Sequence, residues 1–468
     1  MTRETRRSRR FLEWLDRRGL DDRPLIGTDD RRVSRIVVIP VLAESDLLFG
    51  TLRSLSENPT EELEETLVIC VVNNRTQPHA RPDQIDDNRK ILAKLDGIVR
   101  GGGTLTRQKG QPASLRLAFI DASSSGQELG PKMGVGEARR IGLDHGLRVL
   151  CQNNFPDGLL ISLDADSTVA PNYLEAIGRH FAASDSDAGV VAFAHPLPED
   201  HKHREAMLLY ELFLRYHELG LRVAGSPYAL PTVGSTIVVR GTAYVAAGGM
   251  NRKEAGEDFY FIQQLVKTGW VSRIDTTTIF PSYRSSDRVP FGTGAAIGRF
   301  LGGDQAIRRV YHPQSYRLLG AWLDLVQNNL EADASDLLED TTTIAPELGQ
   351  FLIKKDFKNT WPRLQDNAPD LPGLVAQFHR WFDAFKSLKL IHHLRDNGLP
   401  SMPLEDAISD LFPSLEPKNG NANLSLRLQL LLDRLRETCS DPAAPGFPGR
   451  TPGSVARTYL VKQMTPIN

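Results

Sequence analysis

Residues 159–174 read LLISLDADSTVAPNYL, and this stretch decides the fold. It opens with a short apolar run that predicts a buried strand, which stops at Asp164-Ala165-Asp166. Side chains two residues apart in an extended chain point the same way, so both carboxylates project from the strand end. Such a pair is costly unless a sugar or a divalent cation completed by substrate phosphates compensates it. The alternative is that Asp166 and Ser167 only cap the next helix.

Strand and helix patterns alternate on both sides of this stretch. The other strands that we predict are 36–39, ended by Pro40, and 67–72, 115–120 and 188–194. The helices that we predict are 44–57, 84–99, 134–150 and one beginning at Pro171. This order predicts an α/β fold with a mostly parallel, Rossmann-like sheet and helices on both faces. Ligands of such sheets bind beyond the carboxyl ends of the strands.

The pattern changes beyond residue 203. We predict a long helix over 205–223, a short strand over 236–239 and a helix over 258–267. From residue 313 the chain reads as mainly helical. We therefore predict five regions. They are a basic extension (1–33), two halves of an α/β domain (34–200 and 201–312), a helical region (313–440) and a flexible tail rich in Pro and Gly (441–468).

Composition limits the class of protein. Of the 468 residues, 40% are apolar and 24% are charged, which fits a folded protein of two or three domains. The formal net charge of -2 argues against a nucleic-acid binder. Three scattered cysteines, Cys70, Cys151 and Cys439, are too few for a disulfide framework and fit a reducing compartment. No apolar run approaches the roughly 18 residues that span a bilayer, so we predict a cytoplasmic protein without a transmembrane segment.

The N-terminus departs from this neutral balance. Its first ten residues, MTRETRRSRR, contain five arginines and one glutamate. A disordered, solvated tail is the favoured interpretation. The alternative is contact with an anionic membrane surface, which would make the protein peripheral to the inner face of a membrane.

Four segments of this sequence, in this order, resemble the family 2 glycosyltransferases of GT-A fold over about residues 34 to 290. The segments are VVIPVLAE (37–44), GPKMGVGEARRIGL (130–143), LDADSTVAPNYL (163–174), and VGSTIVVRGTAYVAAGGM (233–250) with AGEDFYFIQQLVKTG (255–269). The resemblance implies transfer of one sugar from a nucleotide-sugar donor to a hydroxyl acceptor. It makes 34–200 the donor-binding half and 201–312 the acceptor-binding half of the domain.

The resemblance also assigns residues to the donor. The positions that it matches to the nucleoside or the diphosphate are Pro40, Ala43, Glu44, Asn74, Lys132, Gly136 and Arg139. The family usually has an acidic pair that binds uracil where this chain has Asn73-Asn74, and an asparagine can also hydrogen-bond a base edge. The departure leaves the base open; the resemblance favours a UDP-sugar as the donor, with a GDP-sugar as the alternative. For Gly134 and Gly136 the structural alternative is flexibility at a helix start, and for Arg139 it is a solvated helix face.

Further residues are matched to the chemistry. By resemblance Asp164 contacts sugar or ribose hydroxyls, and Asp166 binds a divalent cation (Mn²⁺ or Mg²⁺) that neutralises the leaving diphosphate. Asp258 matches the aspartate that removes the acceptor proton, with Glu257, Gly234 and Ser235 on the acceptor side. The structural alternative is that Glu257 and Asp258 only favour the start of a helix. The acceptor class, whether a small molecule, a glycan or a lipid-linked sugar, stays open.

Other interpretations also stay open. A retaining GT-A enzyme lacks such a base and often adds a histidine to the metal, for which His312 and His195 are candidates. The segment Tyr283–Gly294 suits a mobile loop in which Arg284 and Arg288 clamp a phosphate; no Q-x-x-R-W segment of processive members is found. A nucleotidyltransferase would open with a glycine-rich basic loop, which VIPVLAE lacks. A non-catalytic sugar-nucleotide scaffold would not need Asp164, Asp166 and Asp258.

Overall fold

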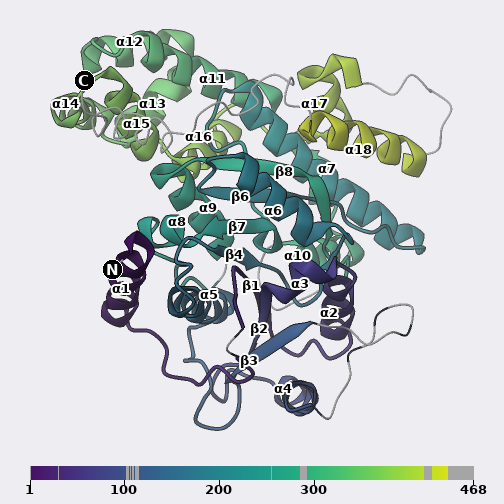
Figure 1. The fold of residues 1–468 in the computed structure, drawn as a ribbon. Helices are drawn as coiled ribbons and strands as arrows, with labels where there is room; N and C mark the ends of the chain where they lie inside the picture. The colour runs from purple at the N-terminus through teal and green to yellow at the C-terminus, as the bar shows by residue number, and fades with distance from the viewer. Residues whose placement is uncertain are drawn as a thin grey trace. The chain divides into compact units, whose positions relative to one another are not determined.

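The chain divides into two compact units in the computed structural model (Figure 1). The residues that the structure describes are 2–29, 31–101, 105, 107, 110, 115–254, 256–284, 292–415 and 424–440. The first unit holds the described residues up to Pro196 with Thr232–Leu265 and Val271–Ser282. The second holds Leu197–Pro231, Val266–Trp270 and the described residues from Tyr283 onward.

The first unit is built on one eight-stranded sheet of order β3-β2-β1-β4-β7-β6-β8-β5. Strands β3, β2, β1 and β4 are parallel, β7 runs antiparallel to β4 and β6, β8 is parallel to β6, and β5 is antiparallel to β8. The mostly parallel sheet of the prediction is therefore confirmed. The strands are β1 Arg35–Val41, β2 Thr66–Asn73, β3 Arg116–Ala122, β4 Leu159–Ser162, β5 Thr168–Val169, β6 Ala188–Phe193, β7 Ile237–Arg240 and β8 Val271–Phe280.

Two details of the sheet correct the sequence analysis. Pro40 lies inside β1 rather than ending it. Val38 O accepts from Leu163 N at 3.0 Å, so the backbone N–H and C=O groups of even-numbered residues of β1 point toward β4. Since β4 pairs only as far as Ser162, Pro40 lies past that ladder and its missing N–H costs no strand hydrogen bond. Strand β8 was missed because its centre is polar, reading Asp275-Thr276-Thr277-Thr278.

Helices cover both faces of the sheet, as predicted (Figure 1). Helices α2 Leu48–Ser56, α4 Pro82–Val99 and α6 Tyr173–Ala183 share one core with Val37 and Ile39 of β1. Helix α5, Val135–Gln152, lies on the other face, where a Cβ at Gly142 would come within 2.3 Å of Val38. Glycine is therefore required for the close approach of α5 to the sheet. Further helices of this unit are α3 Thr60–Glu64, α8 Gly241–Ala246 and most of α9 Glu257–Thr268.

The arginine-rich N-terminus is a helix, which overturns the prediction of a disordered tail. Helix α1, Arg3–Arg18, begins with the Thr2 hydroxyl accepting from Thr5 N at 3.1 Å and ends at Gly19 in the left-handed conformation. It packs against α5, with Leu15 fully buried and Trp14 edge-on to Tyr244 at 6.1 Å between ring centroids. Apolar residues at helical spacing among the arginines supply this packing face, and net charge alone conceals it.

The second unit is mainly helical, which confirms the prediction for the C-terminal region. Its core includes Trp322, packed edge-on against Phe357, Phe378 and Phe382. Its helices are α7 His201–Val223, α10 Thr293–Leu301, α11 Pro313–Asn328, α12 Ala334–Ile344, α13 Pro346–Lys354, α14 Phe357–Asn367, α15 Leu371–Trp381, α16 Ala384–Asp396, α17 Leu404–Leu411 and α18 Leu424–Ser440. Two short strands, β9 Arg309–Val310 and β10 Met402–Pro403, pair antiparallel.

Two further expectations concern the compartment. Among the described residues, none of the helices is long and apolar enough to cross a membrane. Cys70, Cys151 and Cys439 are buried free thiols. The predicted tail 441–468 lies outside the described residues.

Candidate active site

A tight turn at the carboxyl end of β4 carries the two aspartates. Ala165 is buried and its carbonyl accepts from Thr51 Oγ1 at 2.9 Å, while Ser167 N donates to Asp164 O at 3.1 Å. The side chains of Asp164 and Asp166 are both partly exposed. The structural alternative for this turn is wrong, because β5 follows it and Asn172 is the N-cap of α6.

Arg139 lies beneath this turn, in the first turns of α5. It is 2% exposed, so it does not lie on a solvated helix face. Its guanidinium donates to Asp164 Oδ1 at 2.9 Å and to Glu257 Oε1 at 3.3 Å. It also donates to Gly234 O at 3.2 Å and to Ser162 Oγ. The nearby carboxylates raise the pKa of Arg139 although burial opposes this, so the group stays protonated. The structure therefore commits Arg139 to pairing carboxylates.

Glu257 and Asp258 form the first turn of α9, as their sequence pattern predicts. Burial, and secondarily the neighbouring carboxylate of Glu257, raise the pKa of Asp258 to about 7. Burial also raises the pKa of Glu257, against the opposing effect of Arg139. Asp258 Oδ1 accepts from Phe259 N at 2.7 Å. A carboxyl whose pKa lies near neutrality can accept a proton during a reaction and release it afterwards.

Gly136 brings α5 up to the segment that precedes Asp258. A Cβ at this position would lie 2.3 Å from Lys253 O and 3.0 Å from Glu257 Cβ. Gly134 has the same constraint, with a Cβ that would lie 2.8 Å from Glu254 O. Close backbone approach, rather than flexibility at a helix start, therefore explains both glycines.

The residues matched to the nucleoside meet at the ends of β1 and β2. Asn88 of α4 joins them: its Oδ1 accepts from Ala43 N at 2.9 Å, and its Nδ2 donates to Asn73 O at 2.9 Å and to Asn74 Oδ1 at 3.0 Å. Ala43 has a φ of 52°, a strained conformation for a residue with a side chain. Glu44 is buried beside it. Sequence reasoning missed Asn88, which lies in the middle of a helix without any motif.

Asn73 and Asn74 are both buried, and their side chains hold backbone carbonyls. Asn73 Nδ2 donates to Val41 O at 2.9 Å, and Asn74 Nδ2 donates to Arg75 O at 3.1 Å. Recognition of a base edge by Asn74 therefore stays a prediction. Lys132 is exposed on the loop that leads into α5, where its charge faces solvent.

The remaining predicted residues lie elsewhere. Gly234 and Ser235 are both buried in the 3₁₀ turn η1, Gly234–Thr236, and their place on the acceptor side stays a prediction. His195 is buried with its ring edge-on to Phe193. His312, in the second unit, is the N-cap of α11 through a hydrogen bond from Gln314 N at 3.1 Å. Arg284 precedes residues 285–291, so Arg288 and most of the proposed loop lie outside the described residues.

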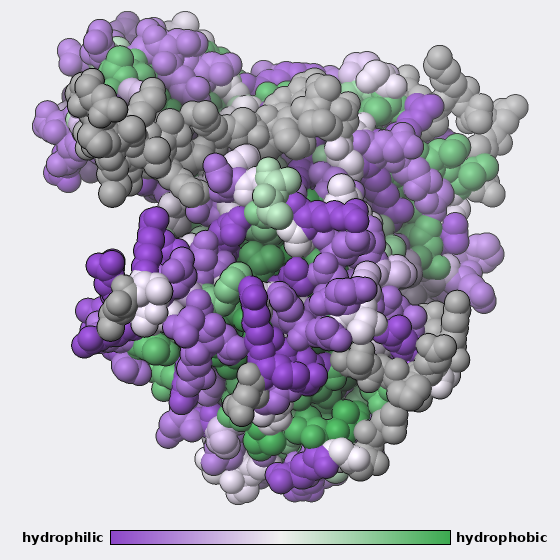
Figure 2. Space-filling view, in the orientation of Figure 1, coloured by the Kyte–Doolittle hydropathy of each residue, from purple (hydrophilic) through white to green (hydrophobic). Residues whose placement is uncertain are grey.

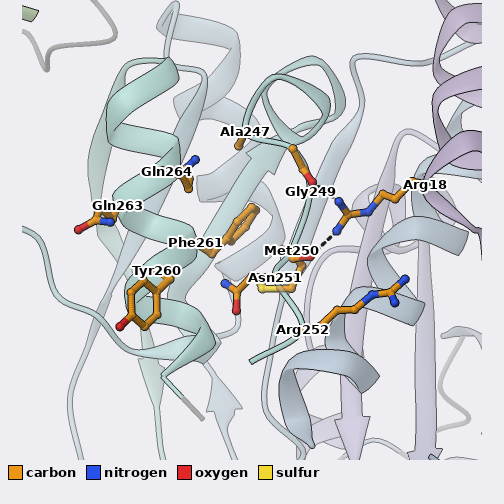
Figure 3. A pocket seen from close by; sticks show the side chains of 11 residues that line it. Arg18, Ala247, Gly249, Met250, Asn251, Arg252, Tyr260, Phe261, Gln263 and Gln264 are labelled. Carbon is orange, nitrogen blue, oxygen red and sulfur yellow. Dashed lines mark hydrogen bonds between the residues drawn. The ribbon is translucent and has the colours of Figure 1, made fainter. Parts of the chain in front are cut away.

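The segment between α8 and α9 is held from two sides by arginines that sequence reasoning did not assign. Arg18 of α1 donates to Gly248 O and Met250 O and lies 3.6 Å from Asp144 Oδ2 (Figure 3). From the end of β2, Arg75 donates to Met133 O at 2.7 Å and to Glu254 Oε1 at 2.5 Å. Nothing in the sequence around Arg18 or Arg75, apart from the residue type, indicates these contacts.

The same segment is tied directly to the acidic pair. Asn251 Nδ2 donates to Glu257 O at 2.8 Å. Arg18 and the segment line one side of a pocket of about 630 Å³, and the α9 residues Tyr260, Gln263 and Gln264 line the other (Figure 3). Arg18 therefore contacts α9 indirectly: it binds Met250 O, and the next residue, Asn251, binds Glu257 O at the start of α9.

Comparison with known proteins yields structural neighbours only. No family model matches the chain, and no curated protein sequence matches it. One solved structure, S. aureus TarS 1–349, has 11% identity and a TM-score of 0.33 over 93% of this chain and 94% of its own. The same protein with UDP-GlcNAc has 12% identity and a TM-score of 0.35 over 93% and 94%. With UDP the values are 12% and 0.34, over 75% and 92%.

We predict that Asp258→Asn stabilises the protein in a pH-dependent way. In the folded protein the pKa of Asp258 is about 7, whereas in the unfolded chain it is near the ordinary 3.8. Between these two pH values the folded protein holds a proton that the unfolded chain has released. The free energy of unfolding therefore falls as pH rises from about 4 to about 7, and asparagine removes this deficit. Thermal unfolding at pH 8 should show Tm raised by about 2–4 °C. At about pH 4 the two proteins should nearly agree, because the deficit has not yet developed there. The exposed control Asp83→Asn should change neither value; an unchanged Tm at pH 8 would contradict the raised pKa.

A second prediction concerns Arg18. Replacing it by glutamine removes its hydrogen bonds to Gly248 O and Met250 O, so the segment 247–254 should open more often. Hydrogen exchange measured by mass spectrometry should become faster in peptides covering this segment. Arg17→Gln is the matched control, because the Arg17 side chain is exposed and, among the described residues, its hydrogen bond goes to Glu13 O of its own helix. Equal exchange in both variants would show that α1 does not hold the segment.

Proposed function

We propose that the protein is a glycosyltransferase that moves a single sugar from a nucleoside-diphosphate donor to a hydroxyl acceptor. The observation that carries the proposal is Asp258, a carboxyl with a pKa near 7. It begins a helix that Arg139 joins to the Asp164-Ala165-Asp166 turn. A proton acceptor thus belongs to the same network as a pair of aspartates at the carboxyl end of a parallel strand, where ligands of such sheets bind.

The chemistry follows from what each group can do. Asp258 Oδ2 takes the proton of the acceptor hydroxyl as the oxygen forms a bond to the anomeric carbon. The bond from that carbon to the diphosphate oxygen breaks with its electron pair, and the nucleoside diphosphate leaves. Attack opposite to the leaving group inverts the anomeric configuration. Asp164, held at 2.9 Å by Arg139, is oriented toward hydroxyl groups of the donor.

The acidic residues fit a divalent cation. Asp164 and Glu257 share the single positive charge of the Arg139 guanidinium, which cannot neutralise both carboxylates. No group of three or more His, Cys, Asp and Glu side chains within the described ranges could hold a metal ion by itself. Asp166 and Asp164 would therefore hold Mn²⁺ or Mg²⁺ together with oxygens of the donor diphosphate. When bound, the cation supplies Lewis-acid stabilisation of the departing diphosphate.

The donor and the acceptor are proposed at different levels of detail. A UDP-sugar is favoured, because the family that the sequence resembles usually ends its second strand in an acidic pair that binds uracil. A GDP-sugar is the alternative, because this chain has Asn73-Asn74 at that position. The TarS structures with UDP-GlcNAc and UDP agree with this choice of donor but, at their TM-scores, add no weight to it. The acceptor is a hydroxyl group of a molecule whose class stays open.

We predict that metal and nucleotide bind together. Isothermal titration should show weak binding of Mn²⁺ alone and clear binding of UDP only when Mn²⁺ is present, because the chain provides too few ligands without the diphosphate. Asp166→Ala should abolish the metal-dependent part of UDP binding, whereas the exposed control Asp83→Ala should leave it intact. Absence of any binding of UDP or GDP in the wild type would contradict the proposed function.

We also predict that Asp258→Asn separates binding from transfer. The variant should bind UDP with Mn²⁺ as the wild type does, while its rate of donor hydrolysis or transfer falls by about 10²–10⁴-fold. In the wild type kcat/KM should fall about tenfold per pH unit below about 7, because only the ionised carboxylate accepts a proton. A wild-type rate in the variant would remove Asp258 from the base role.

The same assays separate the alternatives. Product with retained configuration and an active Asp258→Asn variant would indicate a retaining enzyme. Release of pyrophosphate from a nucleoside triphosphate would indicate a nucleotidyltransferase. Nucleotide binding without turnover of any sugar nucleotide would indicate a non-catalytic scaffold.

A further inference from the structure

Helix α1 has two faces of different character. Ser8 and Leu15 are buried on the face that packs against α5. At 3.6 residues per turn, Arg3, Arg6, Arg10 and Arg17 fall on the opposite face within a stripe about 60° wide. All four are exposed, and Figure 2 shows mainly hydrophilic side chains over this helix, at the left of the view. We call these four residues the arginine stripe.

The charge of the stripe is concentrated and little compensated. Residues 2–18 contain seven arginines and three acidic residues, so this segment carries a formal charge of +4 in a chain whose total is -2. Glu13 lies on the same side but pairs with Arg9, at 3.0 Å. Within the part of the chain that the structure describes, Arg3, Arg6 and Arg10 make no ion pair. The stripe therefore presents its charge to solvent.

The shape of the stripe decides between anionic partners. It extends about 21 Å along one straight helix, which gives a convex ridge suited to a plane rather than to a single ligand. Because α1 is packed against α5, it is not free to enter the major groove of a duplex. Single-stranded nucleic acids are usually bound by a basic groove with aromatic rings for stacking. The aromatic residues of α1, Phe11 and Trp14, are only partly exposed, and Trp14 packs edge-on against Tyr244.

We propose that the arginine stripe binds the surface of an anionic lipid bilayer. None of the large apolar side chains that are exposed in the described residues belongs to α1, so the helix lies on the headgroups without insertion. Binding is then electrostatic, at about fivefold in partitioning for each arginine near the surface, and is lost when salt shortens the Debye length. This docking is independent of the proposed chemistry, because the stripe shares no residue with the Arg139 network.

Co-sedimentation of the full chain with vesicles tests the proposal. At about 50 mM salt the protein should bind vesicles of phosphatidylcholine with 30% phosphatidylglycerol and not vesicles of phosphatidylcholine alone, and about 500 mM salt should release it. The variant Arg3→Gln/Arg6→Gln/Arg10→Gln should bind about 100-fold more weakly. The control Arg53→Gln/Arg89→Gln/Arg179→Gln changes the net charge equally on exposed positions of other helices and should bind as the wild type does.

Three results would overturn the proposal. They are no binding of the wild type to the anionic vesicles, equal weakening in both triple variants, and preferential binding of a single-stranded RNA or a DNA duplex that displaces the vesicles. Thermal unfolding of both variants checks that α1 stays folded. UDP titration of the first triple variant should match the wild type, so a failure of lipid binding is distinguishable from a failure of the proposed transferase.

Discussion

The buried guanidinium of Arg139 is the interaction on which the site depends. A charged group with 2% exposure is tolerated only where its hydrogen bonds are satisfied and its charge is paired. Its partners come from β4, from the turn after β4, from η1 and from the start of α9. These segments are far apart in the sequence, so one side chain brings together the aspartate turn and the acidic pair.

The electrostatics of the site follow from an imbalance around this arginine. A single guanidinium pairs with Asp164 and Glu257, and Asp258 next to them has no such cation of its own within hydrogen-bond distance among the described residues. Burial and the charge of Glu257 then raise the pKa of Asp258 toward neutrality. Ionisation of Asp258 therefore lowers the stability of the folded protein, a cost that is common for groups that exchange protons. Arg18 and Arg75 hold the segment 247–254, which precedes Asp258 in the chain.

Much of the α/β unit could be predicted from the sequence, because its central strands are short apolar runs and its helices have apolar residues at regular spacing. The turn after β4 was found by a local pattern, two aspartates after a buried strand. The role of Arg139 could not be found in this way, since its partner Glu257 is 118 positions away and local sequence indicates only a basic residue in a helix. For α1, the high arginine content suggested disorder, whereas the packing of Trp14 and Leu15 on distant residues decides the outcome.

A crystal structure of the protein grown with UDP and Mn²⁺, with anomalous scattering recorded at the manganese edge, tests the central claim most directly. The account predicts one anomalous peak beside the Asp166 carboxylate, with the diphosphate on the metal and the uridine near the ends of β1 and β2. Asp258 should face the space where the sugar of a donor would continue from the diphosphate. A nucleotide bound away from the Asp164-Ala165-Asp166 turn, or a manganese peak elsewhere on the chain, would contradict it.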